Sequence, residues 1–186
     1  VMCESLGIDL QGFTSFCRNL ERDIMYIHYL YYTDENMKIT GYNLALSMVA
    51  AFVSIGRIDV CLDKIQNMPS KLRDMYVRFE DFEAMHELIR NIDSVIIACN
   101  LHNKITNTKW IDENAFKKIL MQIKGEAWYR AHSPIVEILY FICSENRVEI
   151  DVADLTGIFS DHANASTQEF TMLSKLRCAL QCLRRI

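Results

Sequence analysis

The sequence has little glycine and proline, six and two residues among 186, and it lacks the motifs that hold phosphates or activate nucleophiles. No GxxxxGK, GxGxxG, GxSxG or HExxH segment occurs. The five histidines are scattered, without a carboxylate or cysteine at ligand spacing. We therefore expect each histidine to be satisfied within the fold or exposed, and we expect no catalytic residues and no enzyme activity.

An excess of charge of one sign and a long apolar run are also missing. The chain carries 24 acidic and 20 basic side chains, a net charge of −4. A nucleic-acid-binding domain would show a basic stripe, so we expect no nucleic-acid partner. The longest apolar run, 45–56, is shorter than the roughly 18 residues that a membrane-spanning helix needs. Nothing at the amino terminus resembles a signal or transit peptide.

Seven cysteines are present, but they form no CxxC pair and their spacings match no zinc site. Since free cysteine packs as a small hydrophobe, we expect several of them to be core thiols. Cys178 and Cys182 are four residues apart and would share one helix face. The odd number of cysteines leaves room for one intermolecular disulfide through this pair, provided that the compartment is oxidising.

A six-residue signature recurs five times, with an aliphatic residue first and Phe or Leu last. It occupies 8–13, 39–44, 77–82, 111–116 and 150–155, and an amphipathic helical run follows each copy. This pattern is typical of the junction between the loop and the exiting helix of an EF-hand. The aliphatic residue would be the eighth of the loop and would form a short β-bridge with its counterpart in a partner hand. The order predicts that Ile39 pairs with Val77 and that Ile111 pairs with Ile150.

The expected fold is therefore all-α, with paired EF-hand-like units and a carboxy-terminal amphipathic helix. The first signature lies too early to have an entering helix, so we expect another hand upstream. We expect 1–31 to be the remainder of an amino-terminal hand pair with its long exiting helix, 32–103 a central pair, 104–160 a third pair and 161–186 the terminal helix. The alternative is a generic helical bundle in which the signature is only core periodicity.

A calcium loop needs oxygen ligands at its first, third and fifth positions, glycine at the sixth and glutamate at the last. Counting from the eighth positions gives the loops 32–43, 70–81, 104–115 and 143–154, and none has this glycine or this glutamate. Lys104 and Arg147 would place a cation where calcium should lie. We expect no metal and no cofactor in this segment, with any calcium sensing located upstream. The weak residual ligand candidates are Asp34, Asn36, Glu145, Asp151 and Asp154.

Residues 166–185 show the most regular helical pattern of the chain. Ser166 and Glu169 fit a capping box at its start. Such a helix can dock into a partner's groove, lie on an anionic membrane surface or pack on its own domain. The candidate partner-binding residues form one apolar stripe, with the basic residues mostly off it: Phe170, Leu173, Leu176, Leu180 and Leu183.

Two shorter segments carry local predictions. Ser133 and Pro134 are typical of a helix start, with serine as the N-cap and proline in the first turn. The charged segment FEDFEAMHE, 79–87, favours a solvated helix face.

Three segments in order resemble the mitochondrial calcium uptake family, the EF-hand regulators of the mitochondrial calcium uniporter. They are FTSFCRNLERDIMYIHYLYYTDENMKIT (13–40), VRFEDFEAMHELIRNIDSVIIACNLHN (77–103) and EFTMLSKLRCALQCL (169–183). The family's carboxy-terminal helix takes part in assembly, which favours partner binding for this one. Typical calcium-sensing members keep one working hand in each lobe, whereas the last loop here is broken, and Cys178 and Cys182 flank the family's cysteine position.

The resemblance implies a regulatory subunit in the mitochondrial intermembrane space that contacts a sister EF-hand subunit, as a homo- or heterodimer, and a membrane channel complex. Peripheral membrane contact is compatible with it. Hands without metal would act as a fixed interface rather than a switch. The alternatives are a calcium-independent structural adaptor and a module that binds a partner by inserting a helix into a groove.

Overall fold

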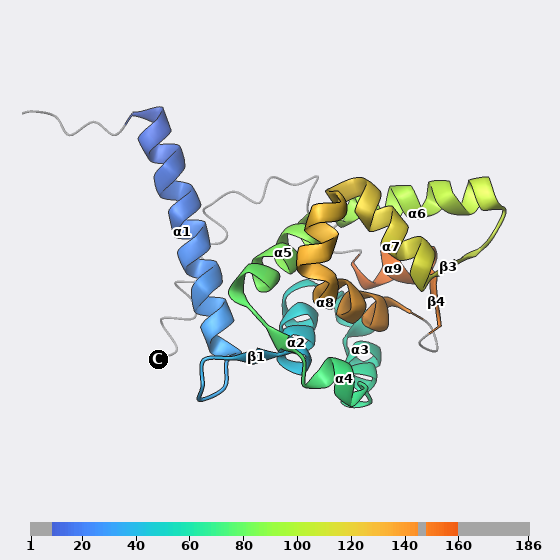
Figure 1. The fold of residues 1–186 in the computed structure, drawn as a ribbon, viewed down its shortest axis with the longest axis horizontal. Coiled ribbons are helices and arrows are strands. Elements are labelled where there is room, and N and C mark those ends of the chain that lie inside the picture. Colours follow the sequence, from blue (N-terminus) through green and yellow to red (C-terminus); the bar gives the residue numbers. More distant parts are fainter. Residues whose placement is uncertain (1–8, 145–147, 160–186) are drawn as a thin grey trace, which may run out of the picture.

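The computed structural model describes residues 9–144 and 148–159, which are mostly helical, so the expected all-α class is confirmed (Figure 1). The first half consists of α1 (Leu10–Tyr31), β1 (Ile39–Thr40), α2 (Gly41–Phe52), the 3-10 turn η1 (Ile55–Arg57), α3 (Ile58–Gln66), α4 (Ser70–Arg73), β2 (Tyr76–Val77) and α5 (Phe79–Arg90). The second half consists of α6 (Ile92–Thr106), β3 (Trp110–Asp112), α7 (Glu113–Lys124), α8 (Glu126–Cys143), β4 (Glu149–Asp151) and α9 (Val152–Ile158).

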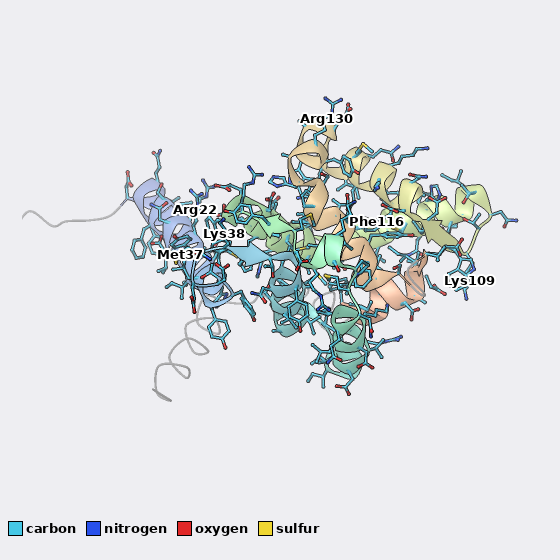
Figure 2. All side chains as sticks on the ribbon, turned by 60° about the horizontal axis from the view of Figure 1, so that its bottom comes forward. Arg22, Met37, Lys38, Lys109, Phe116 and Arg130 are labelled. Atoms are coloured by element: carbon cyan, nitrogen blue, oxygen red, sulfur yellow. The ribbon has the colours of Figure 1, made fainter. Side chains whose placement is uncertain are left out.

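The short strands join the helices into two pairs. β1 lies antiparallel to β2 with Ile39 opposite Val77, and β3 lies antiparallel to β4 with Ile111 opposite Ile150. Both predicted pairings are therefore confirmed. All four aliphatic side chains are fully buried, so each strand pair also anchors its loops to the hydrophobic core. The two strand pairs lie in different parts of the molecule, as Lys109 at one end and Met37 at the other indicate (Figure 2).

The residue after the signature's aliphatic residue begins the next helix. Asp9, Thr40, Asp112 and Asp151 are N-caps whose side-chain oxygens accept hydrogen bonds from backbone N–H groups of the first turn. An N-cap of this kind contributes about 1 kcal/mol, because it satisfies a donor that the helix itself leaves free. In the four copies from Ile39 onward, a β-bridge residue is followed directly by the N-cap of a helix, which explains why the signature recurs there.

The buried apolar side chains form one cluster that extends through both strand pairs. Helix α8 packs against α2, α3 and α5 of the first half as well as against α7. One glycine is needed for this packing. A Cβ atom on Gly41 would lie 2.0 Å from the carbonyl oxygen of Leu72, so only glycine lets the start of α2 approach α4 this closely.

The prediction that 79–87 forms a solvated helix face is wrong. Helix α5 packs against α1, α2 and α8, and several of its polar side chains lie inside the fold. Asp81 and His86 are only 3% and 6% exposed. Because charged residues alternate with apolar ones in this segment, its composition resembles that of a surface helix although its surroundings are those of a core helix.

The predicted helix start at Ser133 and Pro134 coincides with a break between two helical segments of α8. Helix α8 begins at Glu126 and bends at His132, whose backbone has the non-helical angles φ −121° and ψ 24°. Proline cannot donate the hydrogen bond of a continuous helix, and its ring crowds the preceding turn. The second segment of α8 therefore starts at Ser133 and Pro134 as predicted, and the non-helical residue before it is His132 rather than Ser133.

Within 9–144 and 148–159, no helix combines the length and the apolar character that crossing a membrane requires.

Candidate functional site

The loop 32–43 is closed by hydrogen bonds among its own residues. The side-chain amide nitrogen of Asn43, at the last loop position, donates to the carbonyl oxygen of Tyr32, at the first position, over 2.8 Å. In a calcium-binding loop these two positions would meet across the ion. Here they contact each other directly, and the bond fastens the start of α2 to the end of α1.

The carboxylate of Asp34 in the same loop faces the backbone. Its Oδ1 accepts hydrogen bonds from the backbone N–H groups of Lys38 and Asn36, both over 2.9 Å. The bond from Lys38 is the main reason why the pKa of the Asp34 carboxyl lies below its usual value. Met37, at the sixth position, has φ 59°, a left-handed conformation that favours glycine. A methionine therefore occupies a turn position at which glycine would be unstrained.

Asp81, the last residue of loop 70–81, forms the most buried charged contact of the two strand-paired units. Its carboxylate accepts hydrogen bonds from the Arg78 guanidinium over 3.1 Å and from Nδ1 of His132 over 2.7 Å. Burial alone would raise the pKa of Asp81, but the bonds from Arg78 and His132 outweigh it and the pKa is lowered. Arg78 also donates to the carbonyl oxygen of Ala131, so this cluster holds α5 against the bend of α8.

The first half of loop 104–115 is held by hydroxyl and amide hydrogen bonds. Thr106 and Thr108 share a hydrogen bond of 2.8 Å between their hydroxyl oxygens, and the Asn103 side chain donates to the carbonyl of Lys109 over 2.9 Å. The Lys109 ammonium lies 3.1 Å from a carboxylate oxygen of Asp151 on β4. This ion pair joins loop 104–115 to loop 143–154.

The loop that starts at Cys143 is neutralised by two basic side chains from the first half of the chain. The Lys64 ammonium donates to the carbonyl oxygens of Ile142 and Ser144, over 3.0 and 2.9 Å. Arg57 forms an ion pair of 3.1 Å with Asp154, the last residue of the loop. A cation at the carboxyl end of α8 also interacts favourably with the dipole of that helix.

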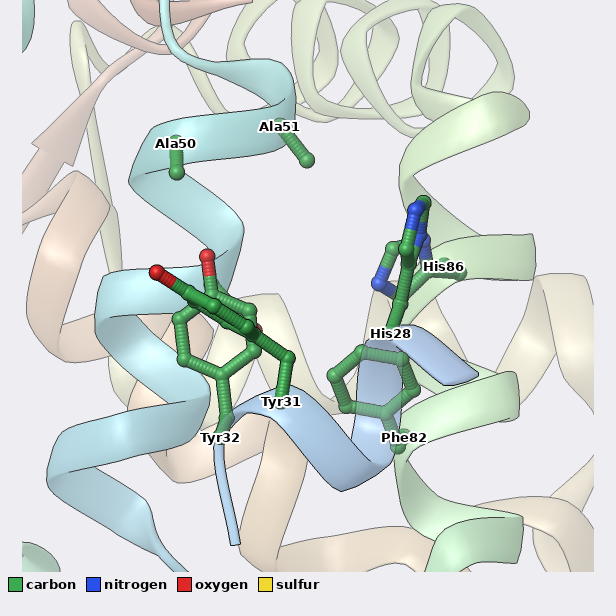
Figure 3. Close-up of a pocket in the computed structure, with 8 residues that line it drawn as sticks. His28, Tyr31, Tyr32, Ala50, Ala51, Phe82 and His86 are labelled. Atoms are coloured by element: carbon green, nitrogen blue, oxygen red, sulfur yellow. The ribbon is translucent and has the colours of Figure 1, made fainter. Parts of the chain in front are cut away.

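A pocket of about 250 Å³ opens between α1, α2 and α5 (Figure 3). Its walls are largely apolar, with two histidines among them: His28, Tyr31, Tyr32, Ser47, Ala50, Ala51, Phe82 and His86. The Nε2 atom of His86 is buried and has no hydrogen-bond partner among the described residues. Burial lowers the pKa of this imidazole to about 3, with smaller contributions from Arg90 and His28. His86 is therefore a neutral wall of the pocket near pH 7.

The buried cysteines are confirmed as core thiols where the structure describes them. Cys61, Cys99 and Cys143 are at most 1% exposed, and Cys17 on α1 is partly exposed. Burial raises the pKa of all three core thiols, that of Cys99 to about 12. They are therefore protonated and unreactive in the folded protein. Cys178 and Cys182 lie outside the described residues.

The structure does not gather the predicted ligand candidates into one place. Asp34 and Asn36 lie in the first loop, Asp151 pairs with Lys109, and Asp154 pairs with Arg57. Among the described residues, no group of three or more His, Cys, Asp or Glu side chains is arranged to hold a metal ion. Glu145 and the apolar stripe from Phe170 to Leu183 lie outside the described residues.

Sequence reasoning missed the distant side chains that bond to loops 70–81 and 143–154. His132 was expected to lack a carboxylate at ligand spacing, yet its partner Asp81 lies 51 residues away. Lys64 reaches carbonyl groups 78 and 80 residues along the chain. The available signal was the acidic residue at the end of two loops, Asp81 and Asp154, because a carboxylate that binds no calcium can pair with a basic side chain.

Comparison with known proteins finds no matching family model, no matching curated protein and no matching solved structure.

Proposed function

We propose that this chain is an array of EF-hand-like units that work without calcium and act through protein–protein contacts. The observation that carries the proposal is the strand pairing of Ile39 with Val77 and of Ile111 with Ile150. In each case the paired residue follows a loop, precedes a helix N-cap and lies at the eighth loop position. This is the arrangement by which two EF-hands form a unit, and a generic helical bundle has no need of it.

The contacts inside the loops support calcium independence. Asn43, Asp81 and Asp154, each at a last loop position, bond to a protein group rather than facing an open coordination site. Calcium switches a sensor by opening a helix pair and exposing an apolar groove. A unit whose loops are already closed by its own side chains has no such switch, so it would offer partners a constant surface.

The segments that resemble the mitochondrial calcium uptake family give a narrower proposal. The chain would be a regulatory subunit of a mitochondrial calcium uniporter complex in the intermembrane space. It would bind a sister subunit and the channel complex, with calcium sensed upstream or not at all. A calcium-independent adaptor unrelated to calcium transport is the second candidate, and the closed loops favour both candidates equally.

A calcium titration of thermal stability tests the first proposal. We expect millimolar Ca²⁺ to leave the melting temperature unchanged, because the described residues contain no group of His, Cys, Asp or Glu side chains arranged to hold the ion. Calcium bound at 100 times its dissociation constant would raise the free energy of unfolding by about 2.7 kcal/mol, which corresponds to a rise in melting temperature of several degrees. Such an increase in the wild-type protein would refute the proposal.

A loop repaired by design provides the positive control. Loop 32–43 keeps Asp34 and Asn36, so the variant Tyr32→Asp, Met37→Gly, Asn43→Glu supplies the missing first ligand, turn glycine and last carboxylate. This variant should gain a calcium-dependent rise in melting temperature. If neither protein responds, the loop does not have the EF-hand geometry that the proposal assumes.

Capture experiments test the narrower proposal. A tagged full chain expressed in mitochondria should retain the uniporter channel complex and a sister regulatory subunit equally well with Ca²⁺ or with a chelator. Retention of neither, with a folded bait, would favour the unrelated adaptor. Retention that requires calcium would contradict the fixed interface.

A further inference from the structure

Helix α1 has one face packed against the body of the protein. Tyr29 is 5% exposed, and its ring and that of Tyr26 contact the ring of Phe79 edge-on, with centroids 5.4 and 5.1 Å apart. Arg22 forms an ion pair of 3.1 Å with Glu83 on α5. These contacts fix the orientation of α1, which Figure 1 shows reaching past the other helices.

The opposite face of α1 is apolar and largely exposed. Leu10, Phe13, Ile27 and Tyr31 are 81%, 51%, 63% and 82% exposed. The residues of this face alternate at spacings of three and four, the spacing of the a and d positions of a coiled coil. An apolar face of this length on one helix marks a docking surface. We call it the α1 stripe: Leu10, Phe13, Cys17, Leu20, Ile24, Ile27 and Tyr31.

The pocket adjoins the α1 stripe. Tyr31 belongs to both, and His28 extends the same side of α1 toward Phe82 and His86 (Figure 3). Ala51 of α2 completes the wall across from these side chains. The pocket and the stripe therefore offer an adjacent helix one continuous apolar surface with a recess at one end.

The carboxy-terminal part of the chain starts close to this surface. The backbone N–H of Ser54 donates to the carbonyl of Ile158 over 2.8 Å, which holds the end of α9 against the residues that follow α2. Ala50 and Ala51 at the end of α2 line the pocket. The seven chain steps from Phe159 to Ser166 span at most about 25 Å, so the tether between α9 and a segment that starts at Ser166 is short.

We infer that residues 166–186 dock on the α1 stripe of the same chain as an amphipathic helix. The two stripes have matching periodicity, because the segment's leucines also alternate at spacings of three and four: Leu173, Leu176, Leu180 and Leu183. Their charges are complementary, since the segment has four basic residues and one acidic residue, and Glu21 and Asp23 flank the α1 stripe. A short tether also gives the segment a high effective concentration at this surface.

This inference goes beyond the proposed function and does not depend on it. It assigns the leucines to a contact within the chain, which was one of the alternatives left open by the sequence. A partner that binds α1 would then have to displace the chain's own carboxy-terminal segment.

The reactivity of Cys17 in the full-length chain tests the inference. Cys17 lies within the α1 stripe, so a docked segment shields its thiol. In the variant Leu176→Ser, Leu180→Ser, the alkylation rate of Cys17 by iodoacetamide, measured by peptide mass spectrometry, should rise by about tenfold or more. Serine adds no charge, so it does not change the electrostatic environment of the thiol. The buried thiols of Cys61 and Cys143 must stay unmodified in every protein, which shows that the fold is intact.

Two further variants locate the contact. Ile24→Ser with Ile27→Ser should raise the reactivity of Cys17 to the same extent, since it alters the other side of the interface. Ile105→Ser, at a 76% exposed position of α6, should have no effect. Wild-type Cys17 that already reacts as fast as in the leucine variant would refute docking.

Light scattering separates docking within the chain from exchange between two copies. Docking within the chain predicts a monomer for the wild type and for both double variants. A wild-type dimer that becomes a monomer in the leucine variant would overturn the inference in favour of a second copy. The wild type could also be a monomer in which Cys17 is shielded and reacts equally slowly in the leucine variant. That result would refute the inference, because something other than this segment would then cover the stripe.

Discussion

Replacing His86 with phenylalanine should remove a loss of stability that the wild-type protein suffers as the pH falls from 7.5 to 5. The imidazole contacts the rings of Phe52 and Phe82, with centroids 4.7 and 4.5 Å away. The groups that further lower the pKa of His86 are Arg90 on the same helix and His28 on α1. Burial is the main reason that its pKa is lowered to about 3, and its buried Nε2 has no hydrogen-bond partner among the described residues that would stabilise the charged form.

The size of the effect follows from the two pKa values. In the unfolded chain histidine has a pKa of about 6.5, so at pH 5 the unfolded state binds a proton that the folded state does not. The folded state is therefore fully stabilised above pH 6.5 and loses stability as the pH falls from there toward 3. At about 1.4 kcal/mol per pH unit, the loss at pH 5 is about 2 kcal/mol. Phenylalanine has no proton to bind, and its extra atom fits the adjoining pocket.

Urea denaturation followed by circular dichroism at pH 7.5 and pH 5 measures this difference. The free energy of unfolding of the wild type should fall by about 2 kcal/mol more than that of His86→Phe. The matched control is His102→Phe on α6, which keeps His86 and should therefore keep the wild-type loss. An equal loss in wild type and His86→Phe would show that His86 does not stay neutral in the folded protein.

Three smaller perturbations test other parts of the structure. Gly41→Ala should lower the free energy of unfolding by about 3 kcal/mol in urea denaturation, because a Cβ cannot fit 2.0 Å from a carbonyl oxygen, whereas Gly56→Ala meets nothing within 4 Å and should cost nothing. Asp81→Asn should lower the free energy of unfolding by about 2 kcal/mol at pH 7. The difference from wild type should narrow below about pH 4, because the wild-type carboxylate, whose pKa is lowered in the folded state, then loses its stabilising effect as it is protonated. Met37→Gly should raise the melting temperature slightly, because it relieves about 1 kcal/mol of left-handed strain. A destabilised Gly56→Ala, a pH-independent deficit of Asp81→Asn or a lower melting temperature of Met37→Gly would contradict the corresponding contact.

The features that the sequence predicted correctly depend on short-range patterns. The positions of the aliphatic residues were enough to pair Ile39 with Val77 and Ile111 with Ile150. The amphipathic runs also indicated a helix after each signature, but not that the N-cap is the residue directly after the aliphatic one. Such features need only a few neighbouring residues, since an N-cap and a β-bridge position are defined within one turn of chain.

The features that were missed depend on contacts between distant segments. The burial of α5 could not be read from FEDFEAMHE, because it follows from helices on several of its sides. The bend at His132 places the imidazole against Asp81, and neither residue alone indicates the other. Periodicity shows which face of a helix is apolar, but not that a polar side chain on another face meets a partner 51 residues away.

The closed loops explain how the strand pairs persist without metal. A calcium ion would link the first and last loop positions and offset the charge of the ligands. In this chain a neutral hydrogen bond from Asn43 links them in one loop, while in two others the last carboxylate, Asp81 or Asp154, pairs with a basic side chain from elsewhere in the fold. These contacts differ chemically, so no single type of substitution would build a calcium site in all loops. Each also joins its loop to another element, so a charge-removing substitution at one loop should loosen the contact between helices before it disturbs the strand pair itself.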